Sequence, residues 1–235
     1  MRMATMAAAV LLAATHGVSA QTYTTVLEPG SPAIAEILCA RLTALGIADA
    51  RVIGLDGGRI AVETRTSDSA DLPARTLNTV LTRPGQIGLH LVLDTAKDGV
   101  DPTPYLDPSQ PPLALDPTPL MTSADLESAR MAEQFGQPAL LLSMTADGAE
   151  RLATVTEAHL GDQLAIVVDG VILSAPRVQS PILGGQAQIT GVGSDDDLLA
   201  LVAILTGGAL PEPLAMVEAQ LGGSDPATPA ICTSG

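Results

Sequence analysis

Two parts of this 235-residue chain show the same order of predicted elements, each arranged around a tight hairpin turn. In the first part the turn is Asp56-Gly57-Gly58, and in the second part it is Asp169-Gly170. An acidic residue followed by glycine between two β-prone runs favours a two-residue hairpin, because both turn positions need a positive φ. The repeated order predicts an α+β fold with two ferredoxin-like units of the βαββαβ type.

The first half carries clear signals for one amphipathic helix at residues 32–45. Ser31 followed by Pro32 is a favourable helix start, because the serine hydroxyl caps the first turn and proline needs no donor there. Gly46 is expected to end this helix. Arg41 lies near the centre of its apolar face, so we expect the arginine stem to pack on the core and the guanidinium to bond the last carbonyls of the same helix. The other elements predicted in this half are strands at 22–27, 51–55, 59–64 and 87–93 and a helix at 72–81.

The second half repeats this order after a capping signal. Thr122 and Asp125 have the spacing of a capping box, which predicts a short helix up to Gln134. Ser194 and the three aspartates at 195–197 predict the start of another helix, where carboxylates stabilise the helix dipole, and this explanation outweighs a metal site. The remaining elements are predicted as strands at 139–144, 164–168, 171–173, 187–192 and 214–219 and as helices at 146–158 and 195–205.

Residues 96–119 hold seven of the 18 prolines of the chain. Such a density disfavours both helix and sheet, and it predicts a semi-rigid, extended connector. We therefore expect a first α+β subdomain at residues 21–95, this connector, a second subdomain at residues 120–221 and a flexible tail at residues 222–235.

The first 20 residues have the pattern of a secretory signal peptide. Arg2 supplies a positive charge, the apolar run at residues 3–14 follows, and a small-x-small ending predicts cleavage between Ala20 and Gln21. The alternative is an N-terminal membrane anchor, for which the apolar run is too short. We expect an exported protein whose mature chain has no transmembrane segment.

Export changes the interpretation of the two cysteines. An oxidising compartment permits a disulfide between Cys39, in the first predicted helix, and Cys232, in the tail. Such a bond would fix the tail to the first subdomain. The alternative is two unrelated thiols, and the sequence does not decide between them.

The net charge of −15 and the scarcity of aromatic residues exclude several classes of protein. A strongly acidic chain repels phosphate backbones and anionic lipids, and without aromatic side chains it has no stacking platform for bases. His90 and His159 lie apart in the sequence, and no metal, phosphate or nucleophile motif is present. We therefore expect no nucleic-acid partner, no catalytic residue, no cofactor and no metal.

An ordered set of short motifs runs through the second half: a D-G turn, an A-P pair, a G-G turn, a Q-I-x-G strand end and a G-A-L-P close. This set resembles the first periplasmic domain of the SecD family, the accessory subunit of the Sec protein-export translocon. The residues that carry the resemblance are Asp169, Gly170, Ala175, Pro176, Gly184, Gly185, Gln188, Ile189, Gly191, Gly208, Ala209, Leu210 and Pro211, with Arg41 and Gly46 upstream. Most are turn or helix-end formers, so the motifs indicate the fold more directly than an activity.

The resemblance implies a base at the first subdomain and a head at the second, with the connector as the hinge between them. It also implies a non-catalytic, periplasmic protein, or one peripheral to the inner membrane, that aids protein translocation. Its partners would be emerging or unfolded polypeptides, or subunits of the Sec translocon. SecD proteins continue from this domain into membrane helices, whereas this sequence ends in a polar tail, so we do not carry over proton coupling.

Two other functions stay open at this point. The first is an envelope structural or assembly module that binds one folded partner protein, because a fold does not fix a function. The second is an exported hydrolase, which lacks any nucleophile and base signature in the sequence.

Overall fold

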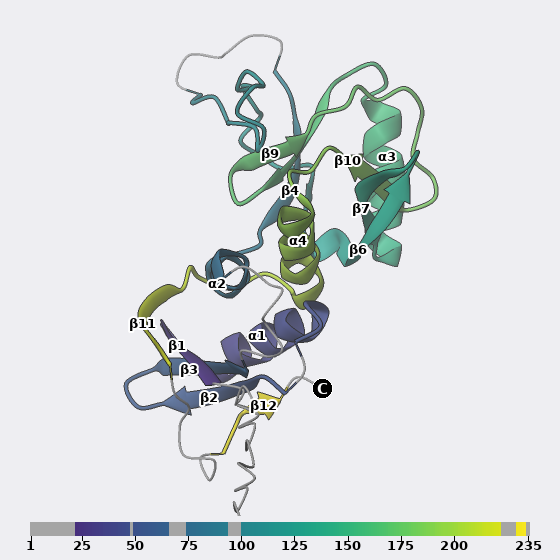
Figure 1. Ribbon diagram of the computed structural model, residues 1–235. Helices are drawn as coiled ribbons and strands as arrows, with labels where there is room; N and C mark the ends of the chain where they lie inside the picture. The colour runs from purple at the N-terminus through teal and green to yellow at the C-terminus, as the bar shows by residue number, and fades with distance from the viewer. Residues whose placement is uncertain (1–21, 48, 66–73, 94–99, 222–228, 234–235) are drawn as a thin grey trace, which may run out of the picture.

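The computed structural model describes residues 22–47, 49–65, 74–93, 100–221 and 229–233, and these residues form two parts (Figure 1). The lower part in Figure 1, which we call the base, is a sheet covered on one face by helices. The upper part, which we call the head, contains two further sheets, and helix α4 (Asp195–Gly207) runs between the two parts. The predicted signal peptide and its cleavage site lie outside the described residues.

The base sheet has five antiparallel strands in the order β11-β1-β3-β2-β12. Helix α1 packs on one face of this sheet and buries Ile34, Leu38 and Leu42. The helix begins as predicted, because Ser31 Oγ accepts a hydrogen bond from the Ile34 amide at 3.3 Å. The elements of the base are β1 (Thr22–Glu28), α1 (Pro32–Ala44), β2 (Arg51–Leu55), β3 (Arg59–Arg65), α2 (Ala74–Thr82), β11 (Ala215–Leu221) and β12 (Cys232–Thr233).

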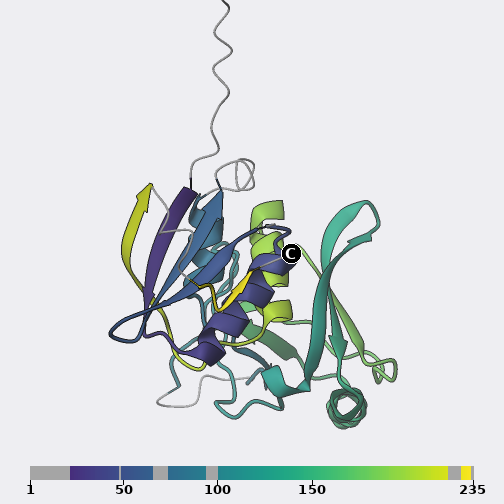
Figure 2. The same ribbon diagram turned by 90° about the horizontal axis from the view of Figure 1, so that it is seen from below.

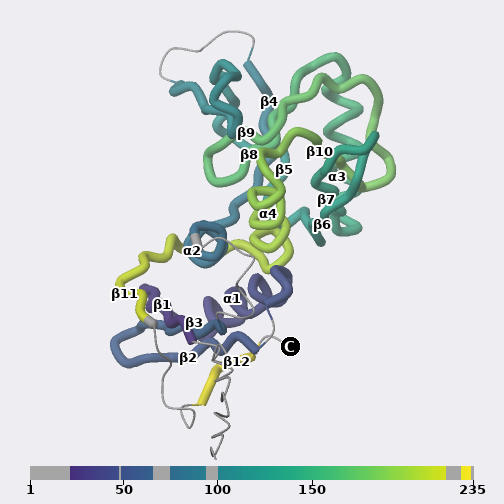
Figure 3. Tube along the Cα trace, in the orientation of Figure 1, coloured from purple at the N-terminus to yellow at the C-terminus, as the bar shows by residue number. Residues whose placement is uncertain are grey.

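The strand that completes the base sheet beside β1 comes from the far end of the chain. The prediction that residues 87–93 close the first unit is wrong, because β4 (Ile87–Leu91) pairs with strands of the head. The strand predicted at residues 214–219 is β11, which leaves the head and pairs with β1. Apolar alternation predicts that a strand exists but not which strand it pairs with, so the sequence could not show this exchange. The tube in Figure 3 shows the two places, after α2 and after α4, where the chain passes between base and head.

The head combines a three-stranded sheet, β10-β7-β6, with a four-stranded sheet, β5-β4-β8-β9. Helix α4 packs on the three-stranded sheet through Leu198, Leu201 and Leu205. Viewed from below, the β6–β7 hairpin extends away from the base sheet, with α4 between them (Figure 2). Besides β4, the elements of the head are β5 (Met121–Thr122), the 3-10 turn η1 (Ser123–Asp125), β6 (Leu126–Gln134), β7 (Gln137–Met144), α3 (Ala146–Ala158), β8 (Leu164–Val168), β9 (Val171–Ser174), β10 (Gln186–Thr190) and α4 (Asp195–Gly207).

Strand β6 replaces the short helix predicted before Gln134. The capping box of Thr122 and Asp125 is present, but it supports only the single turn η1. The following residues pair with β7 around the turn Phe135-Gly136, whose φ angles are 52° and 78°. The helix propensity of this segment is a weak preference, and the pairing with β7 along almost its whole length outweighs it.

The described part of the proline-rich segment, residues 100–119, folds onto the four-stranded sheet of the head. Its backbone exchanges hydrogen bonds with β9, from the Leu106 amide to the Ile172 carbonyl and from the Ile172 amide to the Pro104 carbonyl, both at 2.8 Å. Leu115 is buried against Ala165 in the same sheet. The prediction of an extended connector is therefore wrong for these residues, because apolar residues between the prolines anchor the segment.

Residues 229–233 are likewise held in place, contrary to the predicted flexible tail. Strand β12 pairs with β2, and the Ile231 amide donates to the Val52 carbonyl at 2.7 Å. The structure joins Cys232 to Cys39 in a disulfide with their Cα atoms 6.5 Å apart. The rest of the tail lies outside the described residues. Across the described ranges, no helix combines the length and the apolar character that a membrane crossing requires.

Candidate binding site in the head

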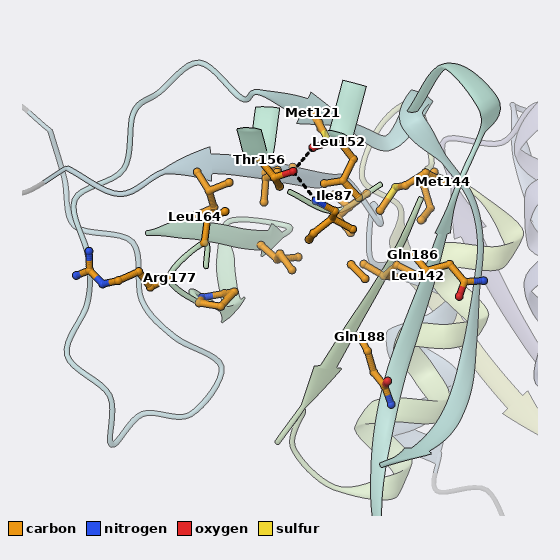
Figure 4. Close-up of a pocket in the computed structure, with 18 of the residues that line it drawn as sticks. Ile87, Met121, Leu142, Met144, Leu152, Thr156, Leu164, Arg177, Gln186 and Gln188 are labelled. Atoms are coloured by element: carbon orange, nitrogen blue, oxygen red, sulfur yellow. Dashed lines mark hydrogen bonds between the residues drawn. The ribbon is translucent and has the colours of Figure 1, made fainter. Parts of the chain in front are cut away.

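An apolar pocket of about 340 Å³ opens between the two sheets of the head (Figure 4). One wall is the four-stranded sheet, with Ile87 and Leu164. The opposite wall is β7 and β10, and Leu152 of α3 lies between the two. The segment at residues 176–182 borders the mouth. Alternation along each strand places apolar side chains toward this space, since the other faces pack elsewhere or meet solvent.

The one buried hydroxyl in the pocket wall is fully bonded. Thr156 Oγ1 donates to the Leu152 carbonyl at 2.7 Å and accepts from the Ile182 amide at 2.9 Å. The second bond ties the segment at residues 176–182 to α3, as the dashed lines in Figure 4 show. The pocket wall is therefore apolar, with its polar groups already paired or at the rim.

Among the described lining residues, Arg177 is the single charged one, and its guanidinium donates to the Gly161 carbonyl at the rim. Gln179, Gln186 and Gln188 supply neutral polar groups. Met144 and Met121 add flexible thioethers to the wall, and methionine adapts to ligands of different shape. The arrangement suits an apolar side chain of variable shape, and it contains no nucleophile and base pair.

A second group of functional candidates lies where the chain passes between base and head. Arg41 of α1 is fully buried, and its guanidinium donates five hydrogen bonds to four carbonyl oxygens. The Val80 carbonyl belongs to α2, the Arg83 and Pro84 carbonyls belong to the segment that leaves the base after α2, and the Gly208 carbonyl belongs to the segment that returns. The bonds join Nη1 to Val80 at 2.8 Å and Arg83 at 2.6 Å, Nη2 to Pro84 at 2.9 Å and Gly208 at 2.7 Å, and Nε to Gly208 at 3.2 Å.

These partners correct the expectation that Arg41 bonds the last carbonyls of its own helix. Burial away from water lowers the pKa of Arg41 to about 10, and the negative charge of Asp169 opposes this effect. The guanidinium still carries its charge near neutral pH, because that pKa lies well above 7.

Asp169 reinforces the same crossing from the head. Its carboxylate accepts from Arg83 Nε at 3.1 Å and from the Gln86 amide at 2.8 Å. The Leu210 amide donates to the Pro84 carbonyl at 2.7 Å, which ties the outgoing and returning segments directly. Asp169 was predicted only as a turn residue. Its positive φ of 50° in the β8–β9 hairpin agrees with that role, and the ion pair adds a second one.

The residues that carry the family resemblance fall into three groups. Arg41, Asp169, Gly208 and Leu210 take part in the bonds at the crossing. Pro176 and Gln188 line the pocket. The others hold the architecture around these places: Gly46 follows α1, Gly170 completes the β8–β9 turn, Ala175 packs beside Ile172, Gly184 and Gly185 precede β10, Ile189 is in the core, Gly191 follows β10, and Ala209 and Pro211 flank Leu210.

The two histidines and the aspartates after Ser194 do not meet in a site. His90 Nδ1 lies 2.9 Å from the Asp116 carbonyl oxygen, and His159 pairs with Asp162. Asp197 completes the capping box of α4 with Ser194. Within the described ranges, no cluster of histidine, cysteine, aspartate or glutamate has the make-up of a metal site.

Most of the pocket residues were missed from the sequence. They come from β4, β5, β6, β7, α3, β8, β10 and the segment at residues 176–182, and no local pattern links these segments. Only the A-P and Q-I motifs supplied residues of the pocket, Pro176 and Gln188, and these residues were named because of the family resemblance.

The comparisons with known proteins agree on one group of relatives. Residues 100–212 match the model of the SecDF P1 head subdomain. The chain is similar to the protein translocase subunit SecDF of Thermus thermophilus, with 42% identity over 101 residues, which cover 43% of this chain and 14% of the relative. It is also similar to the SecDF subunit of Brucella abortus, with 30% identity over 196 residues, which cover 78% of this chain and 25% of the relative.

Solved structures extend the similarity to the base. A crystal structure of SecDF in a super-membrane-facing form matches 85% of this chain and 30% of its own, with a TM-score of 0.68 and 27% identity. A second SecDF structure, described as that of a membrane component that enhances protein export, matches 83% of this chain and 98% of its own, with a TM-score of 0.64 and 28% identity. The chain spans about a seventh and about a quarter of the length of the two SecDF relatives above.

Proposed function

Because the chain belongs to the SecD family, whose P1 head subdomain it carries, we propose that it acts in protein export by holding unfolded polypeptide in the pocket of the head. The observation that carries this proposal is the apolar pocket between the two head sheets, with Arg177 as its one described charge. An emerging polypeptide exposes apolar side chains that a folded protein hides. A pocket lined by leucine, isoleucine and methionine accepts such side chains with little dependence on sequence.

The expected hold on a passing chain is weak and reversible. Full burial of one large apolar side chain contributes about 1.5–3 kcal/mol. The pocket has room for one or two such side chains, and the ordering of the polypeptide opposes part of this gain. A protein that assists export benefits from this balance, because a tightly held polypeptide could not move on.

The remaining features of the proposal follow from the relatives. We place the protein in the periplasm, or peripheral to the inner membrane, with subunits of the Sec translocon as partners, and give it no catalytic role. We also propose that the base is a discontinuous ferredoxin-like unit. Its strand order β11-β1-β3-β2 fits that unit when β11 serves as the fourth strand and the head is inserted between α2 and β11.

Photocrosslinking in living cells tests this function at the mouth of the pocket. A photoreactive residue replaces Gln179, which is exposed and lines the pocket, and a matched control replaces Gln220, an exposed glutamine of β11 in the base. We expect Gln179 to give a range of adducts with newly exported proteins, and these adducts should disappear when export is blocked. Equal adducts at both positions, or none at Gln179, would refute capture in the pocket.

A second candidate function, docking on one folded partner, is favoured by the tip of the β6–β7 hairpin. Phe135 is the single phenylalanine of the chain, its side chain is 98% exposed, and its φ is positive. An aromatic side chain exposed at the tip of a hairpin offers a partner protein a large apolar contact area. A photoreactive residue at Phe135 that gives one discrete adduct, present also after export stops, would support this function.

A further inference from the structure

We propose that the polypeptide binds the head as an added strand on the free edge of β10, beside the pocket. This inference rests on the proposed function and specifies its mode of binding. Strand addition uses backbone hydrogen bonds, which every polypeptide offers, and it leaves alternate side chains for neighbouring pockets. The occupant is therefore an extended chain with apolar residues at alternate positions.

The free edge follows from the position and the hydrogen bonding of β10. The strand lies at the end of its sheet and pairs only with β7. The Met144 amide donates to the Gly185 carbonyl at 2.9 Å, which fixes the alternation of the antiparallel ladder. By that alternation Ala187 and Ile189 bond to β7, so Gln186, Gln188 and Thr190 direct their backbone groups outward. No bond from elsewhere in the described chain reaches these three backbones.

The opposite edge of the same sheet, β6, is protected against strand addition. It carries Glu127, Arg130 and Glu133. Its register is interrupted by a bulge near Ser128, and Thr206 Oγ1 of α4 donates to the Ala129 carbonyl at 2.8 Å. Natural sheets protect their edges with charges, bulges and covering elements of this kind.

None of these devices is present on β10. Its sequence Gln-Ala-Gln-Ile-Thr has no charged residue and no proline, and its register with β7 is regular. The contrast between two edges of one sheet indicates that the β10 edge is kept available for pairing.

The β10 edge is continuous with the pocket. Gln186, Ala187 and Gln188 line the pocket, and Figure 4 shows the strand that carries Gln186 and Gln188 beside it. A strand added there would run along the mouth, with successive side chains on one face about 7 Å apart. One of these side chains would enter the apolar space while the backbone pairs with β10. The backbone pairing and the apolar pocket together would favour extended, apolar segments without requiring a particular amino-acid sequence.

Fluorescence anisotropy with a labelled peptide tests the inference on the purified full chain. The probe is a fluorescein-labelled nine-residue peptide of alternating threonine and leucine. Gln188→Pro removes one outward amide and places the proline ring on the edge, while the bonds to β7 are kept. Met131→Pro is the matched control, because Met131 has the same outward position on β6. Circular dichroism spectra verify that both variants are folded.

We expect Gln188→Pro to weaken the binding of the probe about tenfold, the effect of roughly one or two lost hydrogen bonds, and Met131→Pro to leave it unchanged. A probe with N-methyl groups on alternate residues should lose affinity for the unaltered chain to a similar extent. Equal effects of the two proline substitutions would overturn the inference.

A third variant, Val178→Trp at the pocket mouth, separates this inference from the function beneath it. If Val178→Trp abolishes binding while Gln188→Pro and N-methylation do not, the pocket holds the peptide without strand addition and the inference fails alone. If the unaltered chain does not bind the probe, both fail. If sedimentation shows a dimer that Gln188→Pro converts to a monomer, and the probe does not compete with it, a second copy occupies the edge and the inference is overturned.

Discussion

Replacement of Arg41 by methionine should destabilise the whole protein, although Arg41 lies outside the pocket. Methionine has a similar length and no donor, so Arg41→Met leaves the carbonyls of Val80, Arg83, Pro84 and Gly208 without their shared partner. Hydrogen bonds from a charged donor contribute about 1.5 kcal/mol each at the low end, and five of them therefore about 7.5 kcal/mol.

The burial of the charge opposes this gain. Desolvation, opposed by the charge of Asp169, lowers the pKa of Arg41 from 12.5 to about 10, and at about 1.4 kcal/mol per pKa unit this net shift costs the charged form about 3 kcal/mol. The difference predicts that Arg41→Met lowers the free energy of unfolding by about 4 kcal/mol. The free energy of unfolding of Arg41→Lys should lie between those of the unaltered chain and of Arg41→Met, because a single ammonium group cannot reach both crossing segments.

Urea unfolding followed by circular dichroism measures this change, with Arg59→Met as the control. Arg59 is exposed and donates to the Asp56 carbonyl of its own hairpin at 3.2 Å, so its replacement should cost less than about 1 kcal/mol. Hydrogen exchange adds a local measurement at the Leu210 amide, which is bonded to the Pro84 carbonyl. An Arg41→Met protein within about 1 kcal/mol of the unaltered chain, with this amide still protected, would refute the reasoning.

The other predictions concern the tail and the start of α4. Cys232→Ser should lower the free energy of unfolding by about 2–4 kcal/mol, because the disulfide with Cys39 closes a long loop in the unfolded chain, and a reducing agent should have the same effect in urea unfolding. Ser194→Ala should cost about 1 kcal/mol by the same assay, because it removes the cap of α4. Hydrogen bonds from the Ser194 amide and hydroxyl lower the pKa of Asp197 below its ordinary value of 3.8. The ionised carboxylate therefore stabilises the folded protein above pH 3.8, and this stabilisation is lost as the pH falls through the lower pKa of the folded state. Asp197→Asn should therefore reduce stability at pH 7 and make little difference near pH 2, which unfolding curves at the two pH values would show.

Elements whose ends are set by nearby capping or turn residues were predicted correctly from the sequence. Helix α3 lies at residues 146–158 as expected, and the Asp169-Gly170 turn joins β8 to β9. In such cases caps, glycines and periodicity decide the structure within a few residues of chain. Segment 126–134 shows the limit of this approach, because its strand depends on β7 and its own residues favour a helix.

The candidate sites could be predicted only in part for the same reason. Arg41 stood out as a charge on an apolar face, but its partners are 39 to 167 residues away in the sequence. The pocket has no signal of its own, because leucines and methionines that line a cavity look the same in the sequence as those that fill a core. At residues 100–119 the prediction of an extended connector was wrong for a related reason, because the leucines of this segment pack against β8 and β9, which lie far away in the sequence.

The arrangement of the crossing constrains how the head can move relative to the base. The outgoing and returning segments both accept hydrogen bonds from one guanidinium, and Gly207 lies so close to α1 that a Cβ there would be 2.6 Å from the Arg41 amide nitrogen. A small rotation of the head cannot stretch one of these contacts and spare the others, because all of them meet at Arg41. A reorientation of the head therefore has to break all the contacts at Arg41 together, so the movement would be a transition between discrete states. The ion pair of Arg83 and Asp169 adds to the same barrier from the side of the head. With these bonds intact, the pocket and the edge of β10 keep a fixed orientation toward the base, so the binding of a polypeptide that we propose requires no movement of the head.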